Sequence, residues 1–272
     1  MKVSEIPVMS EVKKDTIDPL YQRVRRCNLL LKFFILLNVS TAVVESLTNF
    51  SFNQALIIIE IISAIIVVIM KWLTDYVFLY EAEKERILYA MTDGYNVNLT
   101  VNETEDYYGN DDKPSLKRYG KNIFESNYYS MVESGKMITP YIFKRILIVA
   151  ILVFAMVRTS NLNFILAGVQ GIFSASIIED SIALVLYHKE MVSLYESQYD
   201  FFIMKNEQLG INSAEEAILI RNIVRYEVVK AYYKVQLDSK IYKKYRDSMN
   251  DNWTKIEKAI NNSVEQGRES NV

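Results

Sequence analysis

The sequence has little of what most enzymes and metal sites require. Its 272 residues include one cysteine, Cys27, and one histidine, His188. A single cysteine excludes an internal disulfide and a zinc site with several cysteines. A single histidine excludes metal sites built on histidine pairs and argues against histidine-based catalysis. The phosphate-binding, dinucleotide-binding, serine-hydrolase and metalloprotease motifs are missing too. We therefore predict a protein that is not an enzyme and needs no cofactor or metal ion.

Glycine and proline are also scarce, with 8 and 4 residues, so turn signals are few and a mainly helical chain is favoured. An excess of charge of one sign is lacking as well. The 31 basic residues face 33 acidic ones, and the formal net charge is −2. This balance excludes a global basic field for nucleic acid, so a site for a polyanion would have to be a local cluster.

Long apolar runs are the feature that the sequence does have. The hydrocarbon core of a bilayer needs about 20 helical residues, and four segments approach or exceed this length: 28–48, 55–73, 141–157 and 163–183. A soluble bundle of buried helices is the alternative. It would give amphipathic periodicity, whereas the second and fourth runs are apolar nearly all round. The runs therefore predict four membrane spans.

Basic residues set the predicted orientation of these spans. Short connections join the first span to the second and the third to the fourth, which makes two hairpins. Lysine and arginine precede the first span, follow the second and flank the third. By the positive-inside rule, both termini and the segment between the hairpins lie in the cytoplasm.

The predicted fold is an all-α membrane protein with four transmembrane helices in two hairpins and helical cytoplasmic extensions. The second and fourth spans should continue into the cytoplasm as helices, because glycine and proline are absent until Gly94 and Gly210. The expected divisions are a cytoplasmic N-terminal segment 1–27, a first hairpin 28–80, a connector 81–140, a second hairpin 141–187, a helical region 188–261 and a disordered tail 262–272.

The connector carries a pattern that resembles a known family. Its stretches DGYNVNLT, EDYYGND and KNIFESNYYS are similar to the core signature of bacterial four-transmembrane effectors of nucleotide-signalling anti-phage defence systems, of the SMODS-associated type. The resemblance covers residues 25–190 and implies a membrane effector that is switched by a nucleotide or short oligonucleotide from a partner nucleotidyltransferase. The matching residues are Tyr107, Tyr108, Asp111, Asn122, Phe124, Glu125, Asn127, Tyr128 and Tyr129.

These signature residues have a second interpretation. The polar ones can cap helices and satisfy the backbone of loops, and the aromatic ones can pack. The segment would then be a folded connector, whether or not it also contacts a ligand. Residues 93–137, between the hairpins, are predicted to have little regular secondary structure, because Asn, Asp, Gly and Pro mark turns there.

Two groups of basic residues are candidates for binding the phosphates of such a ligand. Arginine can bind phosphate through two hydrogen bonds, and tyrosine can stack on a base. The alternative is an ordinary solvated helix face on which acidic neighbours such as Glu216 pair with the cations. The candidates are Lys117, Arg118 and Lys121 in the connector, beside Lys113, and Arg221 and Arg225 on one face of a C-terminal helix.

Two carboxylates, Glu45 and Glu60, lie at equal distances from the first hairpin turn, roughly 10 Å inside its outer end. A charge facing lipid there would cost about 1–3 kcal/mol, so the site should be wet or shared. In an oligomer the two would form an acidic ring that attracts cations at a pore mouth. The alternative is that they fix helix packing through hydrogen bonds to Ser63, Thr41 or Arg158.

Together these features predict a homo-oligomeric inner-membrane effector that forms a pore or depolarises the membrane under the control of a cytoplasmic nucleotide ligand. Four spans in one protomer are too few for a wide pore, so conduction requires assembly. Membrane lipid and further copies of the chain are the expected partners. A small secondary transporter and a membrane-anchored scaffold or receptor without conduction are the alternatives. Gly168 and Gly171 in the fourth run are the hint for a transporter.

Overall fold

The computed structural model describes residues 16–47, 53–101, 108, 110, 112–158, 177–204 and 213–269. All regular structure in these ranges is helical, which confirms the prediction of an all-helical chain. The helices are α1 (Asp18–Leu47), α2 (Asn53–Leu73), α3 (Leu79–Tyr95), α4 (Leu116–Arg158), α6 (Ile177–Tyr199), α7 (Ser213–Tyr233) and α8 (Ser239–Glu269). Two π-helical segments, η1 (Thr74–Phe78) and η2 (Asp200–Met204), continue α2 and α6.

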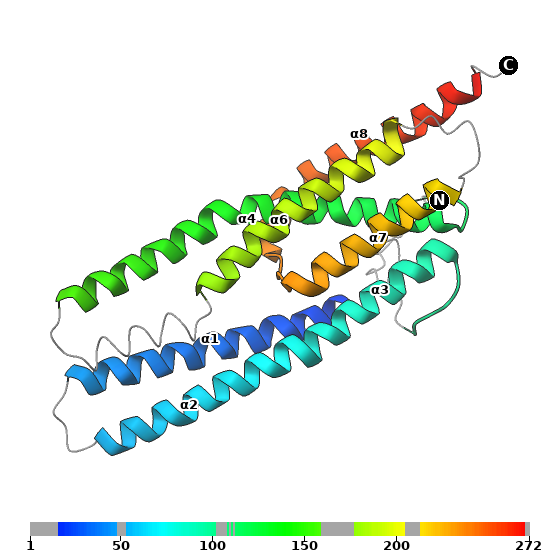
Figure 1. Cartoon of the computed structure of the whole chain (residues 1–272). Coiled ribbons are helices and arrows are strands. Elements are labelled where there is room, and N and C mark those ends of the chain that lie inside the picture. The colour runs from blue at the N-terminus through cyan, green and yellow to red at the C-terminus, as the bar shows by residue number, and fades with distance from the viewer. Residues whose placement is uncertain are drawn as a thin grey trace, which may run out of the picture.

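The helices form an elongated bundle (Figure 1). Helices α1 and α2 pair as a hairpin, and α2, η1 and α3 follow one another without a break. Helix α4 has 43 residues, or about 65 Å at 1.5 Å per residue, and packs along α6. Helices α7 and α8 pack against α4 at the end of the bundle away from the α1–α2 turn. Two long rods therefore connect the two ends of the molecule.

Apolar side chains face outward at the end that holds the α1–α2 turn. On α2 alone, Ile58 is 56% exposed and Val68 is 69% exposed, values that a packed soluble bundle would not give to a row of such residues. The same holds for the second half of α4 and the start of α6. Exposed apolar side chains outside α2 include Leu29, Phe33 and Leu36 on α1, Phe143, Ile146, Ile151, Phe154 and Val157 on α4, and Ile178 and Ile182 on α6.

Among the described residues, the continuous helix Gln54–Tyr95 is the one that is long and apolar enough to cross a membrane, judged by length and composition. It contains the second predicted span. The first and third predicted spans include side chains outside the described set, and most of the fourth lies in the undescribed range 159–176. The structure thus supports one span, and the four-span arrangement stays a prediction.

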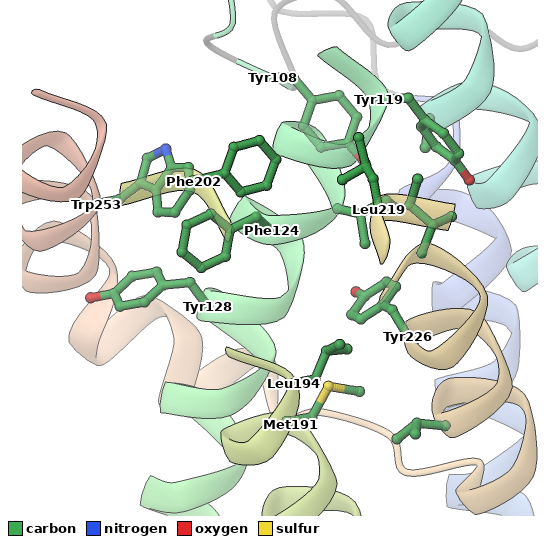
Figure 2. Close-up of a cluster of buried hydrophobic side chains, with 14 of the residues drawn as sticks. Tyr108, Tyr119, Phe124, Tyr128, Met191, Leu194, Phe202, Leu219, Tyr226 and Trp253 are labelled. Atoms are coloured by element: carbon green, nitrogen blue, oxygen red, sulfur yellow. The ribbon is translucent and has the colours of Figure 1, made fainter. Parts of the chain in front are cut away.

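The opposite end of the bundle is a packed core rich in aromatic residues (Figure 2). Phe124 of α4 lies 5.3 Å from the ring of Trp253 on α8 and 5.5 Å from that of Phe202 on η2, centroid to centroid. Leu219 and Tyr226 enter the same core from α7. Burial of side chains of this size stabilises the fold by about 1.5–3 kcal/mol each. This end of the bundle therefore has a hydrophobic core, unlike the end with the exposed apolar surface.

Two parts of the chain differ from the prediction. The segment expected to be irregular over 93–137 becomes helical at Leu116, because its aromatic residues gain partners on α6, α7 and α8 that local turn signals do not reveal. The tail expected to be disordered from residue 262 is helical as far as Glu269. Extending an existing helix needs no new nucleus, and Glu and Gln are good helix formers, so α8 continues.

Candidate functional site

The signature residues lie on the first part of α4 or beside it, in the core. Asn122, Phe124 and Asn127 are completely buried, and Tyr108 is 8% exposed. The ring of Tyr108 stacks on that of Tyr89 with centroids 6.3 Å apart and 15° between planes. Tyr128 and Tyr129 also take part in ring contacts of this core. Tyr107 and Asp111 lie outside the described residues.

Asn122 is the centre of a polar cluster that joins α3, α4 and the segment before α4. Its Nδ2 donates to the Asp93 carboxylate over 2.5 Å, and its Oδ1 accepts from Asn110 Nδ2 over 3.1 Å. Arg118 donates to both carboxylate oxygens of Asp93, at 3.0 and 3.4 Å. Arg118, one of the candidate phosphate ligands, is therefore bound to a carboxylate, where it ties α4 to α3.

Lys121 and Glu125, one turn apart on α4, face α8. Lys121 is 4% exposed, and its Nζ lies 3.4 Å from Glu257 and 3.7 Å from Asp112. Burial raises the pKa of Glu125 to about 8, and Glu257 adds to the increase while Lys121 opposes it. Glu125 is then mostly protonated at neutral pH. The charge of Lys121 balances that of either Glu257 or Asp112.

Asn127 joins α4 to α6. Its Nδ2 donates to Gln198 Oε1 over 2.8 Å and to the Met191 carbonyl over 3.3 Å. Its own side-chain oxygen is buried without a hydrogen-bond partner among the described atoms, as is the Nδ2 of Asn222 on α7. A buried amide that is only half satisfied costs roughly 1–3 kcal/mol. Asn127 and Asn222 thus join α4 and α7 to α6 through hydrogen bonds to Gln198 and Ser197, with one amide atom of each left unpaired among the described atoms.

A second buried cluster, which the sequence reasoning missed, links α3 to α7. Arg86 is 7% exposed; it contacts Glu83 over 2.7 Å and pairs with Glu227. Lys230 lies 3.5 Å from Glu83, and the Tyr226 ring stacks under both cations. Two cations and two carboxylates thus balance in a buried network. The local signal was the Glu83–Arg86 spacing on one helix, but nothing local identifies partners 141 residues away.

The C-terminal candidates take other partners. Arg225 donates to Glu190 over 2.7 Å and to Ser193 over 3.1 Å, and the exposed Arg221 reaches Ser197 at 3.4 Å. All three partners are on α6, whereas the partners of Arg118 and Lys121 are on α3, α8 and the segment before α4. Lys117 is partly buried on α4. The contacts therefore divide the predicted cations between two clusters and do not bring them into one anion site.

The linker between α7 and α8 touches three helices next to the exposed apolar surface. Asn28 of α1 donates to Gln236 over 2.6 Å, and Tyr141 of α4 donates to Asp238 over 2.7 Å. The Lys234 ammonium lies 4.0 Å from the ring centroid of Tyr76 in η1, and Lys234 has a positive φ of 50°. This linker, residues 234–238, therefore contacts α1, η1 and α4 between the core and the apolar end.

The predicted acidic ring is described in part. The Glu45 side chain lies outside the described residues. Glu60 is half-buried on α2, and the contact made at its level is polar: Asn38 Nδ2 donates to the Glu60 carbonyl over 2.9 Å and to Ser63 Oγ over 3.0 Å. An amide that bridges two helices in this way fixes their packing in apolar surroundings.

Comparison with protein-family models finds no match for this chain, and comparisons with curated proteins and with solved structures find none either.

Proposed function

We propose that this protein is a multi-pass protein of the bacterial inner membrane, with four spans and both termini in the cytoplasm. The exposed apolar side chains on α1, α2, the second half of α4 and the start of α6 support this placement, since each would contact lipid. The aromatic core with its buried charges would then lie on the cytoplasmic side, where the positive-inside rule puts the connector.

Within this placement, the protein is an oligomeric effector that opens a pore or depolarises the membrane, and its cytoplasmic helices control the spans. The observation that carries this proposal is the unbroken helix Asn53–Tyr95, which leaves the apolar surface and ends in the core, where Arg86 is held by α7. A rigid helix transmits a displacement at one end to the other. The linker 234–238, which is not helical, is a second connection through its contacts with α1, η1 and α4.

The controlling ligand is a nucleotide or short oligonucleotide, and the family resemblance of the connector supports this choice. Such a ligand would act on the cation-bearing clusters by competing with Asp93 for Arg118, or with Glu190 for Arg225. Phosphate accepts paired hydrogen bonds from arginine as carboxylate does, so a ligand phosphate has the chemistry to replace either carboxylate. A difference in affinity of about 5.5 kcal/mol between closed and open states would shift their ratio from 1:99 to 99:1.

Ion flux from liposomes that contain the purified chain tests the proposal. We expect flux that changes when mixed nucleotide products of a bacterial nucleotidyltransferase are added, and no response in a variant with Arg118→Gln and Arg225→Gln. Flux that is absent under every condition would favour a scaffold or receptor. Uptake that requires a solute gradient and saturates, without ionic current, would favour a transporter.

A further inference from the structure

Helix α7 has an apolar stripe on the face that is turned away from the core. Leu219 and Tyr226 point into the core (Figure 2), whereas the stripe is made of Ala217, Ile220, Val224, Val228, Ala231 and Tyr232. The exposed fractions of the four larger side chains are 48%, 53%, 57% and 76% from Ile220 to Tyr232. Outward positions on a helix outside the apolar end are normally polar, so this stripe has the composition of a contact surface.

The spacing of the stripe is that of a helix that pairs with another helix. Its members recur at intervals of three or four residues over four turns, as core positions do along a paired helix. The small side chains of Ala217 and Ala231 at its two ends allow close approach, and the branched side chains of Ile220, Val224 and Val228 form the middle.

Charge at the edges of the stripe identifies the partner. Glu216 and Arg221, both exposed, are five residues apart. At about 100° per residue, Glu216 lies beside Ile220 at one edge of the stripe, and Arg221 lies near the other edge, between Val228 and Tyr232. In two parallel paired helices, residues with this spacing lie across from each other, so Glu216 of one copy meets Arg221 of the other, twice. Antiparallel pairing would lose this match.

From this pattern we infer that the α7 stripe binds the same stripe of a second copy of the chain, with the two α7 helices parallel. The inference rests on the proposed membrane placement, because two copies inserted in one membrane with one topology must direct their α7 helices the same way. It adds to the proposed function the surface through which protomers assemble, and it places that surface on the helix that holds Arg86 through Glu227.

Disulfide cross-linking in membranes tests this inference. In a Cys27→Ser background, Ile220→Cys and Val228→Cys are made separately, and Lys84→Cys on α3, 54% exposed, is the control. We expect each stripe variant to form a covalent dimer under mild oxidation and the control to stay monomeric. Cross-linking only when Ile220→Cys and Val228→Cys protomers are mixed would show antiparallel pairing and overturn the inference. Monomers in both stripe variants would also overturn it, since another protein or nothing would then cover the stripe.

A charge exchange gives an independent check. In the Val228→Cys background, Glu216→Arg alone and Arg221→Glu alone should each reduce the cross-linked fraction roughly threefold or more, because like charges then meet in both pairs. The double exchange should restore it, and failure to do so would contradict the parallel register. Neither measurement uses ion flux, so a chain that cross-links without conducting refutes the proposed pore and leaves the interface intact.

Discussion

Glu125 and Glu133 on α4 are acids that burial keeps largely protonated at neutral pH. Burial raises the pKa of each to about 8. Near Glu133, Asp238 adds to the increase and Lys230 opposes it. Glu83 behaves in the opposite way: burial alone would raise its pKa, but Lys230 and Arg86 hold it down to about 2. Of these three buried acids, the one that stays charged, Glu83, is the one with two cations beside it.

The protonated glutamates make stability depend on pH. Their folded-state pKa lies above the unfolded value of 4.5, so the stabilisation is complete below about pH 4.5 and is lost as pH rises to about 8. We expect the thermal midpoint in detergent to fall between pH 5 and pH 8, by roughly 2–4 °C per kcal/mol. The variant Glu125→Gln/Glu133→Gln should show a flatter profile, and Asp251→Asn, at an exposed position, should not.

His188 contributes a pH dependence of stability opposite to that of the two glutamates, and it is present in all of these variants. Burial lowers the pKa of His188, so this residue favours folding as pH rises through its unfolded pKa. A double-glutamine variant whose midpoint keeps the wild-type slope would show that the two acids are ionised in the folded protein.

The buried network around Arg86 should be sensitive to the loss of one charge. Arg86→Met leaves Glu83 and Glu227 with Lys230 as the remaining cation, and we expect a loss of roughly 3–5 kcal/mol in the free energy of unfolding. The exposed Arg246, paired with Asp247 on the surface, is the control, and Arg246→Met should cost less than about 1 kcal/mol. Denaturant titration measures both.

A compensating variant distinguishes charge from packing. Adding Glu227→Gln to Arg86→Met restores the balance of one cation and one anion, so part of the lost stability should return. The Glu227→Gln variant alone provides the comparison. If Glu227→Gln lowers the free energy of unfolding as much in the Arg86→Met background as in the wild type, Arg86 acts through its packing alone.

At the scale of elements, α3 and the start of α4 approach closely because Gly94 has no side chain. A Cβ there would lie 2.6 Å from the Cβ of Tyr119 and 2.9 Å from its Cα, atoms that cannot turn away. Gly135 faces the ring of His188, where the nearest atom would be 2.9 Å away but belongs to the end of a movable side chain. An added methyl group would therefore meet atoms that cannot move at Gly94 and a side chain that can move at Gly135.

We therefore expect Gly94→Ala to destabilise the fold by about 1–3 kcal/mol through overpacking. Gly135→Ala should cost less, since the imidazole can rotate and alanine favours the helix by up to about 1 kcal/mol. Equal thermal midpoints for the two variants would contradict the close contact between α3 and α4.

The sequence allowed the helices to be predicted more accurately than the contacts between them. The helix through residues 55–95 was predictable, because Gly and Pro are absent until Gly94 and its apolar run is long. The helical state of residues 116–137 was not, since it depends on Trp253, Phe202 and other partners far along the chain. Arg118 and Lys121 looked like free cations for the same reason: Asp93 and Glu257, which pair with them, are distant in sequence.

At the scale of the whole molecule, the elongated bundle has an apolar end and a core end (Figure 1). The rod α2–η1–α3 and helix α4 extend through both, and the linker 234–238 contacts α1, η1 and α4 between them. A change in the core thus has continuous helices through which to reach the apolar end. All of the proposed functions depend on that end being in the membrane.

Cysteine accessibility tests this central claim most directly. In a Cys27→Ser background, single cysteines at positions 53 and 161 should react with a membrane-impermeant maleimide on intact spheroplasts. Cysteines that replace the exposed Lys113 and Asp251 should react only after the membrane is permeabilised. Labelling of position 113 or 251 in intact spheroplasts, or protection of position 161 in them, would contradict four spans with a cytoplasmic core.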